Sequence, residues 1–437
     1  MYSKIYTRYV ATVLLLVYIF NQLDRGVFSI LMEPLRRQFS LTDTQLGFAV
    51  GPALVVMYSL LGVPIARLGD RTPRIRIMTV AIALWSILTV LTAATNQFWQ
   101  LALARVGVGI GEAGFSAIAV SVIGDYESDE NRPRALAYFM LAVPIASFLS
   151  DFFGGWVNEF YGWRSVFVIA GLPGILLAVL MLTTIREPTR RQAKDATEEA
   201  TRPPFRQVLS TLWQRRSLRH LMLAQGIANI APNAIGWTYV YFIRQYHMGT
   251  GELGSWFAAS DLVTLGGVWM SGWLAARLGA AGQPSRITRV LAGGALLMAP
   301  MVVFVLWCPS KTWALVAYLL LTVPMYGYIA PVPTLVQNLV GPSMRATIVA
   351  IYFLAQMLLG GVLGTQLVGA ISDVLLPLVG DSTAALRWSM ALVSMATLWA
   401  AVHFWLAGRY VQEDLRAGRS DPDDTGLHQH VDPLASR

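Results

Sequence analysis

Two short stretches of this sequence, ARLGDRTPR at 66–74 and GWLAARLG at 272–279, share one spacing. Each has a small residue, a leucine two positions later and an arginine five positions later, and each closes an apolar run long enough to cross a bilayer. The second copy has lost its acid, because Ala276 stands where the first has Asp70. Parallel repeats are typical of transporter folds, and an ordinary channel subunit does not predict them. The pair therefore predicts a membrane protein made of two similar halves.

The composition agrees with a membrane protein. Of the 437 residues, 55% are hydrophobic and 13% charged, whereas a soluble domain carries about 25% charged residues. The single cysteine, Cys308, excludes a disulfide framework within the chain. The first apolar stretch runs on into a full span, so we expect no cleaved signal peptide. The net charge of +8 does not indicate nucleic-acid binding, because the basic residues sit in short loops between apolar runs.

Runs of about 20 mostly apolar residues mark candidate spanning helices. We predict twelve, which makes the chain an all-α polytopic membrane protein with twelve transmembrane helices in two six-helix bundles. The ranges are 8–31, 45–66, 76–95, 98–124, 134–158, 163–185, 218–243, 252–276, 287–307, 312–339, 346–371 and 386–408.

The polar stretches divide the chain into four parts. Residues 1–185 are expected to form the N-terminal bundle and residues 218–410 the C-terminal bundle. Between them, 186–217 is rich in Arg, Lys, Glu, Thr and Pro, and is predicted to be a cytoplasmic linker. The tail at 411–437 is polar and is expected to be a disordered cytoplasmic segment.

The distribution of Lys and Arg predicts the orientation. With the N-terminus in the cytoplasm, 25 of the 33 Lys and Arg lie in inside segments, 6 in outside segments and 2 within spans. This asymmetry follows the positive-inside rule. We therefore expect a multi-pass protein of the cell (inner) membrane with both termini cytoplasmic.

Charged residues within spans are the sharpest functional signal, because a lone charge in a bilayer costs several kcal/mol. The first span contains Asp24 and Arg25, and the fourth contains Arg105 and Glu112. The latter two are two helical turns apart, on one face and about 10 Å from each other. Two acids and two bases at similar depth can exchange partners, bind an anion and titrate. The alternative is a static salt-bridge lock.

Further candidates lie outside this quartet. Asp151, in the fifth span, is either a second protonation site or a surface acid near the outer end. Asp70, Arg71 and Arg74 lie at the inner end of the second span, where they can hold an inner gate shut. Amide and aromatic side chains of the second half can form the other wall of a cavity, namely Asn229, Asn233, Trp237, Tyr241, Tyr326, Tyr328, Gln337, Asn338, Gln356 and Gln366.

Prolines and glycines within the spans predict local features of the helices. Pro324, Pro331 and Pro333 predict a kink in the tenth span. The GxGxxG string within RVGVGIGEAG at 105–114 is not a dinucleotide site, because no strand precedes it. Its glycines indicate close helix packing instead.

Several of these motifs together resemble one family. LGDRTPR at 68–74 resembles the signature loop of the major facilitator proteins. NQLDR at 21–25, RVGVGIGEAGFS at 105–116, IGDY at 123–126, and GPSMRATIVA at 341–350 followed by GAISD at 369–373 resemble the Spinster branch. That branch comprises proton-linked exporters of lysophospholipids and sphingosine phosphate in animals, with bacterial relatives.

The resemblance implies the major facilitator fold, and roles for the quartet. Asp24 and Arg25 become the first-span pair for coupling and headgroup binding, with Arg105 and Glu112 as their partners. The sequence departs from the branch at Ala66, which replaces the usual glycine of the signature. In the fifth span it has Ala146 and Ser150 where glycines are usual, and Asp151 where a neutral residue is usual. The eleventh span, LLGGVLGTQL at 358–367, lacks a Gly-Asp pair.

These observations predict a proton-coupled secondary transporter that works by alternating access on an amphipathic anionic lipid. Its proton-coupling residues are Asp24, Glu112 and Asp151, and no cofactor or metal is expected. We expect a monomer in the bilayer, with protons and a lysolipid or other small molecule as partners. The alternative substrate is a small organic anion. The expected substrate-binding residues are Arg25, Arg105, Asn233, Trp237, Tyr241, Tyr326 and Gln356.

An intramembrane lipid-modifying enzyme is a weaker alternative. Such an enzyme needs a nucleophile with a base, or a metal site. The five histidines lie near span ends or in the tail, at His220, His247, His403, His428 and His430. Their positions therefore give little support to an active site within the membrane.

Overall fold

The computed structural model describes residues 3–128, 130–189 and 203–419, and these residues form helices and connecting turns. The N-terminal bundle contains α1 (Lys4–Ile30), α2 (Met32–Phe39), α3 (Asp43–Val50), α4 (Pro52–Arg71), α5 (Arg74–Thr92), α6 (Phe98–Glu112), α7 (Phe115–Tyr126), α8 (Arg132–Met140) and α9 (Ala142–Thr184).

The second half of the described chain begins within the predicted linker, 186–217. It contains α11 (Phe205–Gln214), α12 (Arg216–Ala228), α13 (Ile230–Ile235), α14 (Thr238–Tyr246), α15 (Thr250–Ala280), α16 (Pro284–Trp307), α17 (Lys311–Tyr326), α18 (Pro331–Asn338), α19 (Arg345–Gln356), α20 (Thr365–Val379), α21 (Ser382–Ser394) and α22 (Ala396–Arg419). A 3₁₀ turn, η1 (Pro342–Met344), precedes α19, and a π-helical stretch, η2 (Met357–Gly364), joins α19 to α20.

Among the described residues, nine helical stretches are long and apolar enough to cross a membrane. One of them, Arg132–Thr184, holds the predicted fifth and sixth spans, which meet at Gly162 with a φ of 78°. The predicted seventh span is divided among α12, α13 and α14, each shorter than 18 residues. The eighth corresponds to α15, which carries the polar residues Glu252, Asp261 and Arg277. The nine stretches thus correspond to ten of the twelve predicted spans, and α12–α14 and α15 supply the seventh and the eighth.

Interruptions fall where the chain loses helical hydrogen bonds or needs a special backbone conformation. The tenth span breaks between α17 and α18, next to the predicted kink prolines Pro324 and Pro331. The fourth breaks after Glu112, where Gly114 has a φ of 76°. A side chain is strained in that conformation, whereas glycine adopts it freely.

The end of the chain differs from the prediction. Residues from 411 onward were expected to form a disordered tail, but α22 continues without a break to Arg419. Val411 is fully buried against the second bundle, and this contact extends the helix past the bilayer-length segment. Residues 420–437 lie outside the described part. Within the predicted linker, Phe205–Gln214 forms α11, and 190–202 is not described.

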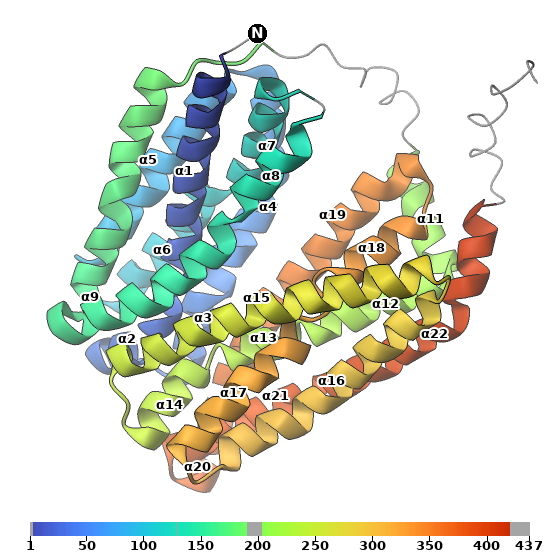
Figure 1. Ribbon diagram of the computed structural model, residues 1–437. Coiled ribbons are helices and arrows are strands. Elements are labelled where there is room, and N and C mark those ends of the chain that lie inside the picture. The colour runs from blue at the N-terminus through green and yellow to red at the C-terminus, as the bar shows by residue number, and fades with distance from the viewer. Residues whose placement is uncertain (1–2, 129, 190–202, 420–437) are drawn as a thin grey trace, which may run out of the picture.

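The two bundles diverge toward the end of the molecule where the N-terminus lies, and they meet at the opposite end (Figure 1). We call these ends the open face and the closed face. At the closed face α9 packs on α15, and α3 packs on α20. One apolar cluster there is shared by both bundles, with Leu35 and Leu46 from the first and Val240 and Phe242 from the second.

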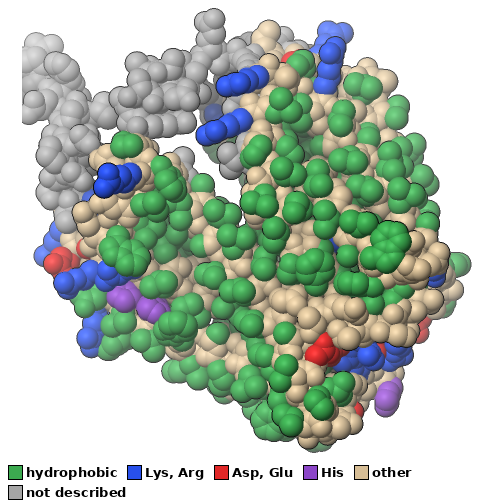
Figure 2. All heavy atoms as spheres, turned by 180° about the vertical axis from the view of Figure 1, so that it is seen from behind, with side chains coloured by type: hydrophobic (Ala, Val, Ile, Leu, Met, Phe, Trp, Pro, Cys, Tyr) green, Lys and Arg blue, Asp and Glu red, His purple; other side chains and the backbone are tan. Residues whose placement is uncertain are grey.

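The outer flanks are apolar. Figure 2 shows hydrophobic side chains spread over both bundles, with Lys and Arg gathered in a few groups. Leu176 on α9, Trp269 on α15 and Leu378 on α20 are more than half exposed. Lipid tails solvate such side chains, so these flanks suit a bilayer.

Candidate transport site

The predicted quartet forms two crossed ion pairs between α1 and α6. Arg105 Nη1 lies 2.8 Å from Asp24 Oδ2, and Arg25 Nη2 lies 2.6 Å from Glu112 Oε2. Thr89 Oγ1 also donates to Asp24 Oδ1 at 2.7 Å. The side chains of Asp24 and Arg105 are each 2% exposed, and that of Glu112 is fully buried. Sequence reasoning brought these four residues together correctly but did not assign which acid holds which base.

The two arginines differ in access. Arg105 lies over the Phe28 ring at 4.5 Å, sealed in the first bundle. The side chain of Arg25 is 25% exposed and lies 4.5 Å over the Tyr58 ring. A substrate can therefore reach Arg25 in this conformation, whereas the predicted substrate contact at Arg105 is not available in it.

Buried polar atoms in this region remain without partners among the described residues. Arg105 Nε, Glu112 Oε1 and Asn21 Nδ2 are such atoms. Buried polar groups are nearly always hydrogen-bonded, so each exception needs an explanation. Because Oε1 of Glu112 has no hydrogen-bond partner among the described residues, this oxygen can accept a proton. A carboxylate that served only as a static salt bridge would be expected to have both oxygens hydrogen-bonded.

Residues from both bundles line a cavity of about 240 Å³. The first bundle contributes Gly26, Ser29, Met32, Val50, Ser147, Ser150 and Asp151, and the second bundle contributes residues of α13, α14, α15, α17 and α20. Of the predicted substrate-binding residues, Asn233, Trp237 and Tyr326 line it.

Two predicted substrate contacts lie elsewhere. Tyr241 is fully buried in the apolar cluster shared by the two bundles, where its hydroxyl donates to the carbonyl of Leu306. Gln356 Nε2 donates to Asn229 Oδ1 at 3.3 Å, away from the cavity wall. In both cases the polar atom is used inside the helix bundle, which the sequence pattern did not reveal.

Asp151 is not a surface acid. It is 5% exposed, lines the cavity, and accepts a hydrogen bond of 2.7 Å from Tyr239 of the second bundle. A second acid in the same wall, Asp261 on α15, accepts from Ser147 at 2.9 Å. Sequence reasoning missed Asp261, although the rule that singled out Asp151, an acid within a span, applies to it equally.

The predicted gating residues lie at the open face. α4 ends at Arg71, directly after Asp70, and Arg71 is exposed. Arg74 is instead buried: its Nη1 lies 2.6 Å from Asp125 Oδ2 and its Nε lies 3.1 Å from Glu187 Oε1. Both partners belong to the first half of the chain, so Arg74 braces that bundle in this conformation.

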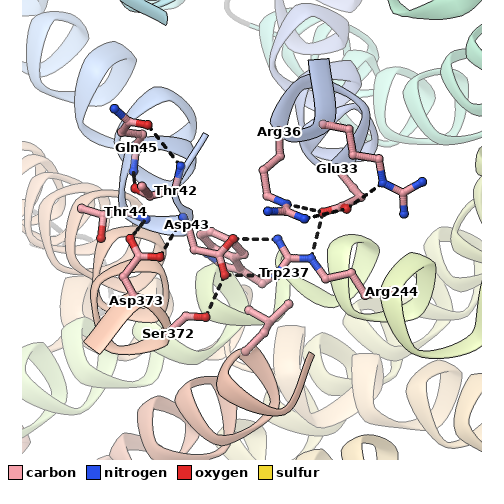
Figure 3. A network of polar contacts seen from close by, with 12 residues as sticks. Glu33, Arg36, Thr42, Asp43, Thr44, Gln45, Trp237, Arg244, Ser372 and Asp373 are labelled. Carbon is pink, nitrogen blue, oxygen red and sulfur yellow. Dashed lines mark hydrogen bonds and ion pairs between the residues drawn. The ribbon is translucent and has the colours of Figure 1, made fainter. Parts of the chain in front are cut away.

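A second charged cluster joins the two bundles at the closed face (Figure 3). Arg244 of α14 donates to Asp43 of α3 through Nη2 at 2.6 Å, and to Glu33 of α2 through Nε at 2.9 Å. Arg36 and Arg37 also donate to Glu33, at 3.0 and 2.9 Å. We call Glu33, Asp43 and Arg244 the closed-face latch.

Acidic residues also cap helices across the interface. Asp373 of α20 accepts from the backbone amides of Asp43 and Thr44, which begin α3, at 3.0 and 2.8 Å (Figure 3). In the other half, Glu159 of α9 accepts from the amide of Gly251 at the start of α15, at 3.2 Å. Each carboxylate meets the positive end of a helix of the opposite bundle. Each bundle therefore supplies an acid that caps a helix of the other bundle, as expected for two similar halves. No local pattern in the sequence predicts which acid caps which helix.

The latch has a predictable pH dependence. Burial raises the pKa of Glu33, but Arg244 and Arg36 outweigh burial and hold this pKa below its ordinary value. Its contribution to stability is therefore complete above the ordinary glutamate pKa, and it is lost as pH falls through the lower folded pKa. In detergent, we expect the melting temperature to fall across this acid range more steeply in the wild type than in Glu33→Gln. Glu252→Gln, which alters an exposed pair, should retain the wild-type slope; equal slopes in all three proteins would contradict the assignment.

Close backbone contact between α9 and α15 makes a second prediction. A Cβ at Gly254 would lie 2.1 Å from the carbonyl oxygen of Asp151, so Gly254→Ala must push the bundles apart. Overpacking of this kind costs about 1–3 kcal/mol. We expect a lower melting temperature and faster labelling of a cysteine in the cavity from the closed face. Gly266→Ala on the same helix meets nothing within 4 Å and should leave both unchanged. Identical behaviour of the two variants would mean that this contact does not hold the closed face.

Comparison with known proteins agrees with this architecture. The family model described as the Major Facilitator Superfamily matches residues 14–365. An MFS-type efflux pump of Mycolicibacterium smegmatis is 30% identical over 92% of this chain and 93% of its own length. The mouse sphingosine-1-phosphate transporter SPNS2 is 26% identical over 85% of this chain and 71% of its own length.

Solved structures show the same relation. A bacterial homologue of the human lysosomal transporter Spinster, in an inward-facing and unoccupied conformation, superposes with a TM-score of 0.86. It is 27% identical, and the match covers 94% of this chain and 99% of that one. These relatives are transporters, so the enzyme alternative receives no support. The two-bundle fold, the family match and the full-length relatives together assign the chain to the Major Facilitator Superfamily, as a multi-pass membrane transporter related to the Spinster proteins.

Proposed function

We propose that the protein is a proton-coupled secondary transporter that moves an amphipathic substrate by alternating access. The observation that carries this proposal is the pair of crossed acid–base contacts between α1 and α6. They join Asp24 to Arg105 and Arg25 to Glu112. The two acids lie inside a bilayer-spanning bundle, and Arg25 remains partly exposed beside the Tyr58 ring.

The coupling step follows from this arrangement. Protonation of Glu112 removes the charge that holds Arg25, and the released guanidinium then binds an anionic group of the substrate. Arginine suits this role because its planar fork binds a carboxylate or phosphate through two hydrogen bonds. Deprotonation restores the pair and expels that group. Asp24 stays paired with the sealed Arg105 and is the second candidate for the transported proton, with Asp151 the third.

The access cycle uses both ends of the bundles. We propose that the open face is cytoplasmic, because the Lys and Arg distribution favours cytoplasmic termini and the N-terminus lies at this face. The structure is then inward-open, a state that the Spinster homologue also adopts. The closed-face latch must break for outward opening, and we expect Asp70 and Arg71 to help close the inner side.

Purified protein in liposomes tests this function. A pH gradient should drive accumulation of an amphipathic substrate, and adding substrate without a gradient should move protons, reported by a trapped pH dye. A lysolipid and a short-chain carboxylate should be compared as substrates. Tighter binding and faster transport of the carboxylate would favour the organic-anion alternative, and substrate flux with no proton movement would contradict proton coupling.

A further inference from the structure

The wall of the 240 Å³ cavity has an unexpected charge. Asp151 and Asp261 are the charged residues among its described lining, and no Lys, Arg or His belongs to that lining. They come from opposite bundles, on α9 and α15. Each is held by a hydroxyl of the other bundle, Asp151 by Tyr239 and Asp261 by Ser147. An anionic group does not suit this wall, because it would meet two carboxyl groups and no cation.

One carboxylate oxygen there lacks a partner. Asp261 Oδ2 is buried and has no hydrogen-bond partner among the described residues. Asp151 is 5% exposed and borders the cavity, and its contact with Tyr239 uses Oδ1. Buried carboxylates are normally paired with a cation or fully hydrogen-bonded. These acids therefore have unused capacity toward the cavity.

Aromatic rings stand beside the acids. Tyr239 and Phe257 have ring centroids 4.0 Å apart, and Phe257 and Tyr318 have centroids 4.5 Å apart. All three line the cavity, together with Trp237 and Tyr326. Aromatic faces attract cations, and recognition of quaternary ammonium groups by several rings is the best-known use of this attraction. The rings and the acids are independent observations, and both favour a cation.

We propose that this cavity binds the cationic group of the transported substrate, a quaternary ammonium or a protonated amine. The two carboxylates neutralise its charge, the rings contact its methyl or methylene groups, and binding bridges the two bundles. This inference rests on the proposed transport function. An amphipathic substrate that also uses Arg25 would carry both charges.

The test uses single-chain amphiphiles of equal chain length that differ in the headgroup. The probes are an alkyltrimethylammonium, an alkylphosphocholine and an alkyl phosphate, bound to protein in lipid nanodiscs and measured by calorimetry. We expect Asp151→Asn and Asp261→Asn each to weaken binding of the two ammonium probes at least tenfold. Binding of the alkyl phosphate should be unchanged or stronger. Asp151→Glu should retain part of the affinity.

Two controls separate a specific loss of ammonium binding from a general loss of stability. Glu252→Gln removes an exposed acid from the same helix as Asp261 and should leave all affinities unchanged. Each variant must melt within a few degrees of the wild type; for a variant that does not, the ratio of ammonium to phosphate affinity is compared instead. Equal losses for all probes, or no loss for the ammonium probes, would overturn the proposal. If ammonium binding depends on Asp151 and Asp261 but a pH gradient drives no transport, the cation site is supported and the proposed transport function is contradicted.

Discussion

Arg244→Ala should open the closed face of the transporter. Arg244 pairs with Asp43 and Glu33 across the two bundles, and all three residues are more than nine-tenths buried. Removing one partner of a buried ion pair typically costs about 3–5 kcal/mol, because the remaining charges stay desolvated. Opening the closed face hydrates both carboxylates and relieves that cost. Even the lower figure shifts a two-state equilibrium more than a hundredfold.

Cysteine labelling measures this shift. In a Cys308→Ser background, Val50→Cys places a thiol in the cavity wall. An impermeant reagent applied to the closed face should label Val50→Cys much faster when Arg244→Ala is also present. Lys311→Ala also removes a basic residue, but its pair with Glu252 is more than 40% exposed. Such surface pairs contribute about 0–1 kcal/mol, so this control should label like its parent. Slow labelling in the Arg244→Ala protein would mean that the latch does not set access.

The fold was predictable because bilayer-length apolar runs and the Lys and Arg asymmetry are properties of the sequence alone. The quartet was predictable for the same reason: charges within spans are costly, and helical spacing gives their depth. Which acid pairs with which arginine was not predictable. Asp24 and Arg25 are neighbours in the chain but point to different partners on α6, Arg105 and Glu112, and this choice depends on how α1 and α6 are rotated against each other.

The closed-face latch was beyond sequence reasoning for a different reason. Asp43 and Arg244 are 201 residues apart, and each lies near a helix end, where a charge is unremarkable by itself. Only the packing of α2 on α14 and of α3 on α20 brings them together. Tyr241 shows the opposite error: an aromatic residue with a hydroxyl in a span suggested a cavity contact, but the hydroxyl satisfies a carbonyl within the bundle.

Glu112→Gln should uncouple transport from the proton gradient. Glutamine keeps the shape of the side chain and its capacity for a hydrogen bond to Arg25, but it imitates the protonated acid permanently. The guanidinium of Arg25 is then always released to the substrate. We expect substrate binding to persist while accumulation driven by a pH gradient falls at least tenfold.

Asp24→Asn makes a contrasting case. Arg105 is 2% exposed, and Asp24 is the acid that forms an ion pair with it. Neutralising Asp24 leaves a buried cation without its counter-charge, which typically costs about 3–5 kcal/mol. We expect a lower melting temperature from this variant in addition to impaired transport, whereas Glu112→Gln should melt close to the wild type. A reversed order of stability would contradict the assigned partners.

The central claim is that protons drive transport through these acids, and one measurement tests it most directly. Wild type, Asp24→Asn, Glu112→Gln and the surface control Glu252→Gln are reconstituted, and each is assayed for pH-gradient-driven uptake and for gradient-free exchange of the same substrate. Wild type and control should perform both, whereas Asp24→Asn or Glu112→Gln should lose driven uptake while retaining exchange. If both variants accumulate substrate against its gradient with the wild-type pH dependence, protons do not act through Asp24 or Glu112, and the central claim is wrong.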